Sequence, residues 1–392
     1  MNNSKETIIF IASSILCGKN RTQFQRAKLL GNKFNTYLLV TYDICPELKK
    51  IIKVKVCPGR RYYLHLVIFP FWVIWEIFKL KQKEKINAVY TSYYPQALIA
   101  GFFAKKLGFK WIADIWDAPS LAIEIAKNYK NFYAKVQKVF YQMLHFFIKK
   151  ILKKADLIIL ALEPEAIKEY KVDFKKVIHV TNGVSLKAIE SVIKNINKKI
   201  NIANKEKFTL IYVGHIMKSR GIDLILEAAD RLKNKISDYQ FILVGYAKEE
   251  DKNWLFKEIN ERELKEYVKF LGKLEHKRTL KQIIKSDVCL FLFPNSKELR
   301  YIYPIKIFEY MALGKPNIAT NLKGVSRIIK NRKNGILVNN VNELVDSILE
   351  LYYDKNLRSK LGHNALRDVA QYDWKRINSY LFQQITNFLE AN

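Results

Sequence analysis

Residues 303–316, Tyr-Pro-Ile-Lys-Ile-Phe-Glu-Tyr-Met-Ala-Leu-Gly-Lys-Pro, predict a short helix with two clear ends. Pro304 suits the first helical position, where its missing N–H costs nothing. Gly314 suits a left-handed C-terminal cap, and Pro316 prevents the helix from continuing. The apolar neighbours of Glu309 place its carboxylate on or beside a buried face, which is costly unless something hydrogen-bonds it.

Two interpretations of Glu309 follow from the residues alone. In the first, Glu309 pairs with Lys306 at i−3, which contributes a few tenths of a kcal/mol at a surface. In the second, Glu309 accepts two hydroxyls of a ligand while the N-terminal turn of the helix holds a phosphate.

The wider pattern, P-x-K-x-F-E-Y-M-A-x-G-K-P followed by an apolar strand, resembles the donor-binding signature of family 4 retaining glycosyltransferases. That resemblance implies the GT-B fold, in which two doubly wound Rossmann-like α/β domains face each other across a cleft. We expect an N-terminal acceptor-binding domain over residues 1–190 and a nucleotide-sugar-binding domain over residues 206–371. The last helix, about residues 372–392, is expected to cross back to the first domain.

Size and composition agree with two globular domains. A chain of 392 residues is too large for one ordinary core, and 49% of its residues are hydrophobic and 27% charged. The four cysteines (Cys17, Cys45, Cys57 and Cys289) are scattered, which argues against a zinc site or a disulfide framework and for a reducing cytoplasm. Met1 to Glu6 leads straight into a buried-strand pattern, so we expect no signal peptide.

The formal net charge of +31 predicts attraction to polyanions, namely nucleic acid, an anionic membrane face or phosphorylated substrates. Because the excess is mainly Lys among many Asn and Ile, it also fits a biased genomic composition. Charge alone therefore does not choose the partner.

The first domain begins with a strand, a loop, a helix and a second strand, as doubly wound α/β domains do. In the resembled family the first loop carries glycines against the donor phosphate, and Gly18 matches one of them; an ordinary β–α turn is the alternative. The strand pattern at 111–117 ends in Asp-x-x-Asp, Asp114 and Asp117, and Asp117 matches an Asp near the donor sugar in the family. Trp116 stands where that family often has His, and Asp117 also suits a helix cap.

Two segments of this domain combine aromatic residues with lysines. Residues 62–80 approach the length of a membrane span, but His65, Pro70, Glu76 and Lys79 interrupt them. We therefore expect a helix buried on one side, followed by a lysine run that suits an anionic bilayer. Residues 129–154 repeat the pattern, and many of their aromatics also suit a core.

The second domain opens with a strand, a glycine loop and a helix, at 208–213, 214–223 and 224–232. The backbone N–H groups of such a loop suit a diphosphate. The loop resembles the G-R-x4-K-G motif of the family, with His215 after Gly214 in place of Arg and Arg220 in place of Lys. Arg220 is the expected phosphate ligand, and His215 is charged only in part near neutrality; two solvated basic residues on a turn are the alternative. Gly272, with Lys273, lies where the family's chain passes the nucleobase.

In the resembled family Glu309 is the second Glu of E-x7-E, which binds ribose hydroxyls. The first Glu falls at Tyr301, so the usual carboxylate contact to the donor sugar is absent, and Glu298 is a possible substitute. Tyr303, Pro304 and Ile305 supply main-chain groups at the helix start, and Lys306 adds a cation near the phosphates.

Together these features predict a retaining, metal-independent glycosyltransferase, with Asp117, Arg220 and Glu309 as its catalytic residues. Its partners are expected to be a UDP- or GDP-sugar donor, a glycan or polyprenyl-linked acceptor, and an anionic membrane surface, with no nucleic acid. We expect a peripheral location at the cytoplasmic face of the cell membrane, a role in polysaccharide biosynthesis, and no cofactor. Two alternatives remain open, a sugar-nucleotide epimerase of the same fold and a basic nucleic-acid-binding protein.

Overall fold

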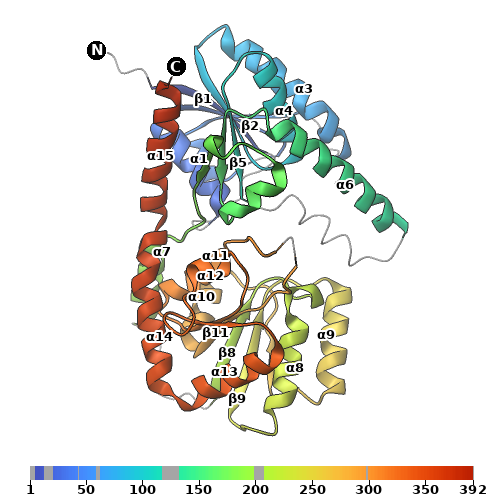
Figure 1. Ribbon diagram of the computed structural model, residues 1–392, viewed down its shortest axis with the longest axis vertical. Helices are drawn as coiled ribbons and strands as arrows, with labels where there is room; N and C mark the ends of the chain where they lie inside the picture. Colours follow the sequence, from blue (N-terminus) through green and yellow to red (C-terminus); the bar gives the residue numbers. More distant parts are fainter. Residues whose placement is uncertain are drawn as a thin grey trace. The chain divides into compact units, whose positions relative to one another are not determined.

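The computed structural model contains two α/β units, each built around its own sheet (Figure 1). It describes residues 5–12, 21–42, 44–58, 62–116, 132–197, 207–296 and 299–391. The first unit comprises Met1–Gly183, Tyr301–Tyr303 and Trp374–Asn392, and the second comprises Val184–Arg300 and Pro304–Asp373.

Seven parallel strands form the sheet of the first unit, in the order β3-β2-β1-β4-β5-β6-β7. The strands are β1 (Thr7–Ala12), β2 (Asn35–Val40), β3 (Lys53–Val56), β4 (Ile86–Thr91), β5 (Trp111–Ile115), β6 (Leu157–Leu160) and β7 (Val177–His179). Most are continuous apolar runs, which is what a sheet covered on both faces requires.

The helices of the first unit fall into two layers. They are α1 (Thr22–Lys33), α2 (Pro46–Lys49), α3 (Tyr62–Lys81), α4 (Pro95–Lys106), α6 (Phe132–Leu152) and α15 (Trp374–Glu390), with short 3₁₀ turns η1 (Pro164–Tyr170) and η2 (Phe174–Lys176). Ile9 of β1 and Val89 of β4 lie in one core with residues of α3 and α4. Trp111 of β5 is the register partner of Val89 and lies in a core with residues of α6. Ile8 and Phe10 point to the other face, where they pack with α1 and α15.

Six parallel strands form the sheet of the second unit, in the order β10-β9-β8-β11-β12-β13. They are β8 (Phe208–Val213), β9 (Tyr239–Val244), β10 (Val268–Phe270), β11 (Val288–Phe291), β12 (Asn317–Thr320) and β13 (Ile336–Val338). The helices are α7 (Leu186–Asn197), α8 (Ile222–Leu232), α9 (Glu249–Glu261), α10 (His276–Lys285), α11 (Ile305–Ala312), α12 (Val325–Ile328), α13 (Val341–Tyr353) and α14 (Lys355–Asp368), with turns η3 (Lys218–Arg220) and η4 (Val369–Tyr372).

The strand order reverses direction between β8 and β11, because the chain moves outward from β8 through β9 to β10 and then returns. In doubly wound sheets, ligands bind at the carboxyl ends of the strands beside such a reversal. The prediction of two doubly wound α/β units is therefore confirmed, and the fold points to the loops after β8 and β11.

Three local expectations differ from the structure. Pro304 is the N-cap of α11 and not its first residue, because its ψ of 125° is extended. Residues 185–205 are polar and rich in Lys and Asn, which is typical of an interdomain linker, but they begin with helix α7, whose isoleucines make it strongly amphipathic. Cys45 is disulfide-bonded, contrary to the expectation that the scattered cysteines form no disulfide framework, whereas Cys57 and Cys289 are free.

Gly314 behaves as the sequence predicts. Its φ of +64° lies in the left-handed region, directly after the end of α11. The two neighbouring carbonyls on Tyr310 and Met311 accept hydrogen bonds from Lys315 and Gly314, which closes the helix end.

Candidate functional site

Three loops at the carboxyl ends of β8, β9 and β10 are joined through their backbones. Gly214 N–H donates to the carbonyl of Val244 (3.0 Å), and Gly245 N–H donates to that of Gly272 (2.9 Å). A Cβ atom on Gly245 would lie 1.6 Å from the Gly214 carbonyl oxygen, so the two loops approach as closely as only glycine permits. The carboxyl edge of this sheet therefore presents main-chain atoms at the place where ligands of doubly wound sheets bind.

Arg220 ends the short turn η3 in the loop after β8. The next residue, Gly221, has a φ of +77°, and a Cβ there would lie 2.4 Å from the Leu292 carbonyl oxygen. The loop thus packs directly on the chain that leaves β11. The Arg220 guanidinium carbon lies 4.8 Å from the centroid of the Phe293 ring, which orients a cation at the reversal between β8 and β11.

His215 occupies the start of the same loop. Its ring packs edge-on against Tyr246, with the ring centroids 5.8 Å apart, while part of the side chain remains exposed. Partial burial and the neighbouring charge of Arg220 lower the pKa of His215. His215 is therefore mainly neutral near pH 7, and it offers a hydrogen bond rather than a positive charge.

Glu309 of α11 is almost fully buried, with 1% of its surface exposed. One carboxylate oxygen lies 2.7 Å from His276 Nε2, and the other accepts a hydrogen bond from Lys306 Nζ, also at 2.7 Å. Burial opposes ionisation, but Lys306 and His276 outweigh it and lower the pKa of Glu309 to about 2. The pair with Lys306 exists as the first interpretation had it, with the carboxylate of Glu309 buried and Lys306 partly exposed.

Helix α11 is fixed against the end of β8 by Tyr310. The Tyr310 hydroxyl accepts a hydrogen bond from the backbone N–H of Val213 (3.1 Å), and both groups are buried. Ile305 and Lys306 begin the helix, so their N–H groups lack partners within it. Two helix starts, those of α10 and α11, thus contribute to one cluster of His276, Lys306 and Glu309.

The predicted site residues divide into three sets. Gly214, His215, Arg220 and Gly272 lie in the joined loops, and Lys306 and Glu309 lie in the α10–α11 cluster. Gly18 and Asp117 lie outside the described residues, as does Glu298.

Tyr303 groups with the first unit. Its carbonyl accepts a hydrogen bond from Asn182 Nδ2 (2.9 Å), and its hydroxyl donates to Glu163 (3.4 Å). Trp116, which stands where the resembled family often has His, packs edge-on against Tyr94 with centroids 6.3 Å apart. Pro304 and Ile305 form the start of α11.

Sequence reasoning missed His276 and Phe293. His276 is the first residue of α10, and no motif connects it with a glutamate 33 positions later. Phe293 continues an apolar strand pattern, which predicts a core residue. Both roles arise because the parallel sheet brings the ends of separate strands together.

The described ranges contain no group of three His, Cys, Asp or Glu side chains arranged to hold a metal ion. Among the helices of those ranges, none has the length and apolarity that a bilayer crossing demands.

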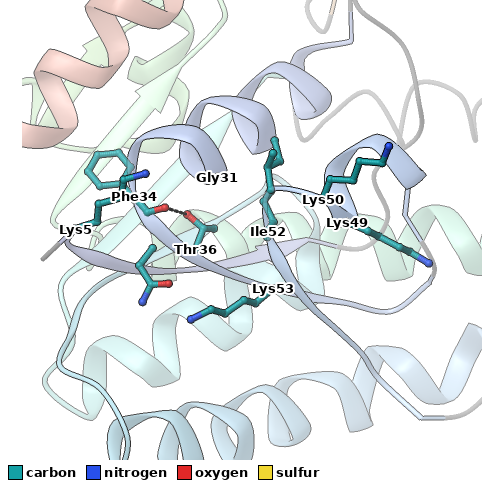
Figure 2. Close-up of a pocket in the computed structure, with 10 residues that line it drawn as sticks. Lys5, Gly31, Phe34, Thr36, Lys49, Lys50, Ile52 and Lys53 are labelled. Atoms are coloured by element: carbon teal, nitrogen blue, oxygen red, sulfur yellow. Dashed lines mark hydrogen bonds between the residues drawn. The ribbon is translucent and has the colours of Figure 1, made fainter.

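One pocket of about 370 Å³ lies in the first unit (Figure 2). Asn35 and Lys53, which line it, are the first residues of β2 and β3. The pocket is therefore at the amino-terminal edge of the sheet, and ligands of doubly wound folds bind at the opposite edge. We do not assign it to the candidate site.

Comparison with known proteins finds a family match within the second unit. Residues 193–368, less than half of the chain, match the family Glycosyl transferases group 1. The match contains the three joined loops, Arg220 and the α10–α11 cluster.

Individual relatives agree with this class. An uncharacterised glycosyltransferase of Methanocaldococcus jannaschii is 25% identical over 65% of this chain, a match that spans 66% of its own length, just under two thirds. The Escherichia coli UDP-Gal:alpha-D-GlcNAc-diphosphoundecaprenol alpha-1,3-galactosyltransferase is 26% identical over 74% of this chain and 73% of that protein. Among solved structures, Anabaena HepE in complex with UDP and glucose superposes with a TM-score of 0.73 at 16% identity, covering 97% of this chain and 100% of that one. This likeness shows the GT-B fold.

Proposed function

We propose that the protein is a glycosyltransferase that moves a sugar from a nucleotide-sugar donor to a glycan or lipid-linked acceptor. The observation that carries the proposal is the charge arrangement of the second unit. A cation, Arg220, lies at the strand reversal, and a buried ionised acid, Glu309, lies in the middle of helix α11. The E. coli relative is named for a UDP-sugar donor, and HepE was solved with UDP, which supports a nucleoside diphosphate as the ligand.

The diphosphate would bind Arg220, Lys306 and the first N–H groups of α11. Arg220 is held on Phe293, so little side-chain freedom is lost when a phosphate binds. Lys306, already beside Glu309, adds a second positive charge. These groups would stabilise the negative charge that develops on the departing nucleoside diphosphate, the main electrostatic task of this reaction.

The ribose hydroxyls would donate hydrogen bonds to Glu309. A carboxylate has about four lone-pair sites, and a ligand hydroxyl would join or replace the contacts with His276 and Lys306. The low pKa of Glu309, about 2, keeps it ionised and accepting at any physiological pH. Gly214, His215 and Gly272 would lie against the rest of the donor, with His215 as a neutral hydrogen-bonding group.

The finer chemistry follows the resemblance to family 4 enzymes. We propose retention of the anomeric configuration without a metal ion, with Asp117 near the reacting sugar and Gly18 near the donor phosphate. The acceptor would bind the first unit. A polyprenyl-diphosphate-linked sugar of a surface polysaccharide at the cytoplasmic membrane face is the proposed class, since the E. coli relative is named for a diphosphoundecaprenol acceptor.

A thermal-shift panel of UDP, GDP and their sugar conjugates tests the donor site. We expect one nucleotide series to raise the melting temperature of the wild type, and Arg220→Gln and Glu309→Gln to abolish that rise. Each shift is measured against the ligand-free melting temperature of the same variant, which separates binding from stability. Arg332→Gln, an exposed arginine of the same unit, is the matched control and should keep the shift.

A panel in which no nucleotide stabilises the wild type, or in which Arg220→Gln responds like Arg332→Gln, would contradict the assigned donor site. Release of nucleoside diphosphate that requires an added acceptor then distinguishes transfer from epimerisation, in which the nucleotide stays attached to the sugar.

A further inference from the structure

Helices α3, α4 and α6 of the first unit form one layer over a face of the sheet, with α4 in contact with both neighbours. Their inner sides fill the core. Phe69, Val73 and Ile77 of α3 and Ile148 and Leu152 of α6 are at most 3% exposed. The outer sides of these helices point away from the sheet, where polar residues are expected.

The outer side of α3 is apolar instead. Phe71, Trp75 and Phe78 recur at intervals of four and three residues, so they lie on one side of the helix. Phe71 is 67% exposed and Trp75 60% exposed. A helix that is apolar on both sides is normally covered on both.

Helix α6 repeats the arrangement. Met143, Phe146 and Phe147 share its outer side, and Met143 is 69% and Phe146 60% exposed. We call the set Phe71, Trp75, Phe78, Met143, Phe146 and Phe147 the outer apolar face. Exposed aromatic groups on two helices of one layer exceed the scattered single residues that any surface carries.

Positive charges lie beside these rings. Lys79 Nζ is 5.0 Å from the centroid of Trp75, and Lys150 Nζ is 4.5 Å from that of Phe146. In the sequences of the three helices Glu76 is the only acid. Glu76 is buried and forms ion pairs with Lys55 and Lys79, so it offsets part of their charge, whereas α4 and α6 carry no acid.

These charges indicate which partner can cover the outer apolar face. A second copy packed through the same face would bring lysine against lysine, with no exposed acid on the described helices α3, α4 and α6 to pair with, which is repulsive. An anionic bilayer suits both the exposed rings and the lysines, since its interfacial region accepts aromatic rings and its phosphates attract ammonium groups.

We propose that the outer apolar face, with Lys79, Lys149 and Lys150, binds the surface of an anionic lipid bilayer. The inference deepens the membrane part of the proposed function and does not depend on the sugar that is moved. The rings enter the boundary between headgroups and acyl chains, while the lysines remain with the phosphates.

Sedimentation of the full chain with lipid vesicles tests the surface. We expect the wild type to pellet with vesicles that contain phosphatidylglycerol, to bind phosphatidylcholine vesicles weakly, and to be released by salt. The quadruple variant Phe71→Ser, Trp75→Ser, Met143→Ser, Phe146→Ser should lose at least about tenfold in partitioning, because each of the four side chains contributes apolar area. The variant Lys149→Gln, Lys150→Gln should lose about fivefold per lysine.

Matched controls use exposed residues that do not belong to this layer. Phe174→Ser with Tyr353→Ser removes two rings that are 54% and 70% exposed, and Lys355→Gln with Lys360→Gln removes two exposed lysines of α14. Both control variants should bind vesicles like the wild type. Circular dichroism and the nucleotide thermal shift, recorded without lipid, show that each variant is folded and separate this proposal from the donor site.

Two results would overturn the proposal. One is a wild type that stays in the supernatant with phosphatidylglycerol vesicles while UDP or GDP still stabilises it. The other is a folded quadruple variant that binds as the wild type does. A third result would also contradict the proposal. If the wild type self-associates with rising concentration and only the quadruple variant loses this, the face binds a second copy of the chain and not a bilayer.

Discussion

Replacing Glu309 with Gln tests the buried ion cluster directly. A pKa of about 2, against 4.5 for an unperturbed glutamate, means that the folded protein favours the ionised form by about 3 kcal/mol. Glu309 is only 1% exposed, so solvent screens little of this energy. Lys306 and His276 are 33% and 52% exposed, and water can solvate them in the variant. We therefore expect Glu309→Gln to lower the free energy of unfolding by about 2–3 kcal/mol at pH 7.

The pH dependence has a defined sign. Because the pKa of Glu309 is depressed in the folded state, its contribution to stability is complete above about pH 4.5 and is lost as the pH falls toward 2. Urea unfolding of wild type and variant, followed by fluorescence between pH 3 and 7, should show a difference that shrinks steadily below pH 4.5.

Glu258→Gln is the matched control for this measurement. Glu258 pairs with Arg262 at 3.0 Å on the surface of α9, and such a pair contributes at most about 1 kcal/mol. The reasoning fails if Glu309→Gln costs no more than Glu258→Gln at pH 7, or if its cost is the same at pH 3.

Three further substitutions are expected to lower the free energy of unfolding, which denaturant unfolding can measure; each cost below is given in that quantity. Arg26→Met leaves the fully buried Asp114 without its cation (Nε to Oδ2, 3.2 Å) and should cost about 3–5 kcal/mol, whereas Arg332→Met, at an exposed pair, should cost less than about 1. Gly245→Ala sets a Cβ 1.6 Å from a backbone oxygen and should prevent the native loop packing, whereas Gly272→Ala, with open space around its Cβ, should cost only about 1 kcal/mol for its φ of +67°. Tyr310→Phe removes the acceptor of the buried Val213 N–H and should cost about 1–3 kcal/mol, a result that an unchanged midpoint would contradict.

The sequence predicts the strands well because fully covered parallel strands are continuous apolar runs, as at 7–12 and 208–213. It also predicts the C-terminal cap at Gly314, since few residues adopt a left-handed conformation without strain. It cannot predict the partner of Glu309. His276 reaches Glu309 only because the fold brings the first residue of α10 beside the middle of α11, and that contact depends on strand order.

The polar stretch after Gly183 shows a second limit. Its lysines and asparagines indicate a linker, yet its isoleucines recur with helical spacing and form α7. Composition outweighed periodicity in the prediction, and the periodicity was correct. The outer apolar face shows a different limit. From the sequence, the aromatic residues of α3 and α6 are predicted to be core residues, and only the position of the sheet shows which side of each helix is exposed.

The contribution of α15 to the first unit has a consequence for biosynthesis. Trp374, Ile377, Leu381 and Ile385 complete the core around Phe24 and Leu30, although about 190 residues separate Gly183 from Trp374. At a translation rate of about 5–20 residues per second, that part of the core remains incomplete for roughly 10–40 seconds until α15 is synthesised. The second unit, nearly continuous in sequence, can fold as soon as it leaves the ribosome. The nascent N-terminal half therefore holds an open hydrophobic surface during synthesis, and chaperones would be expected to engage it there.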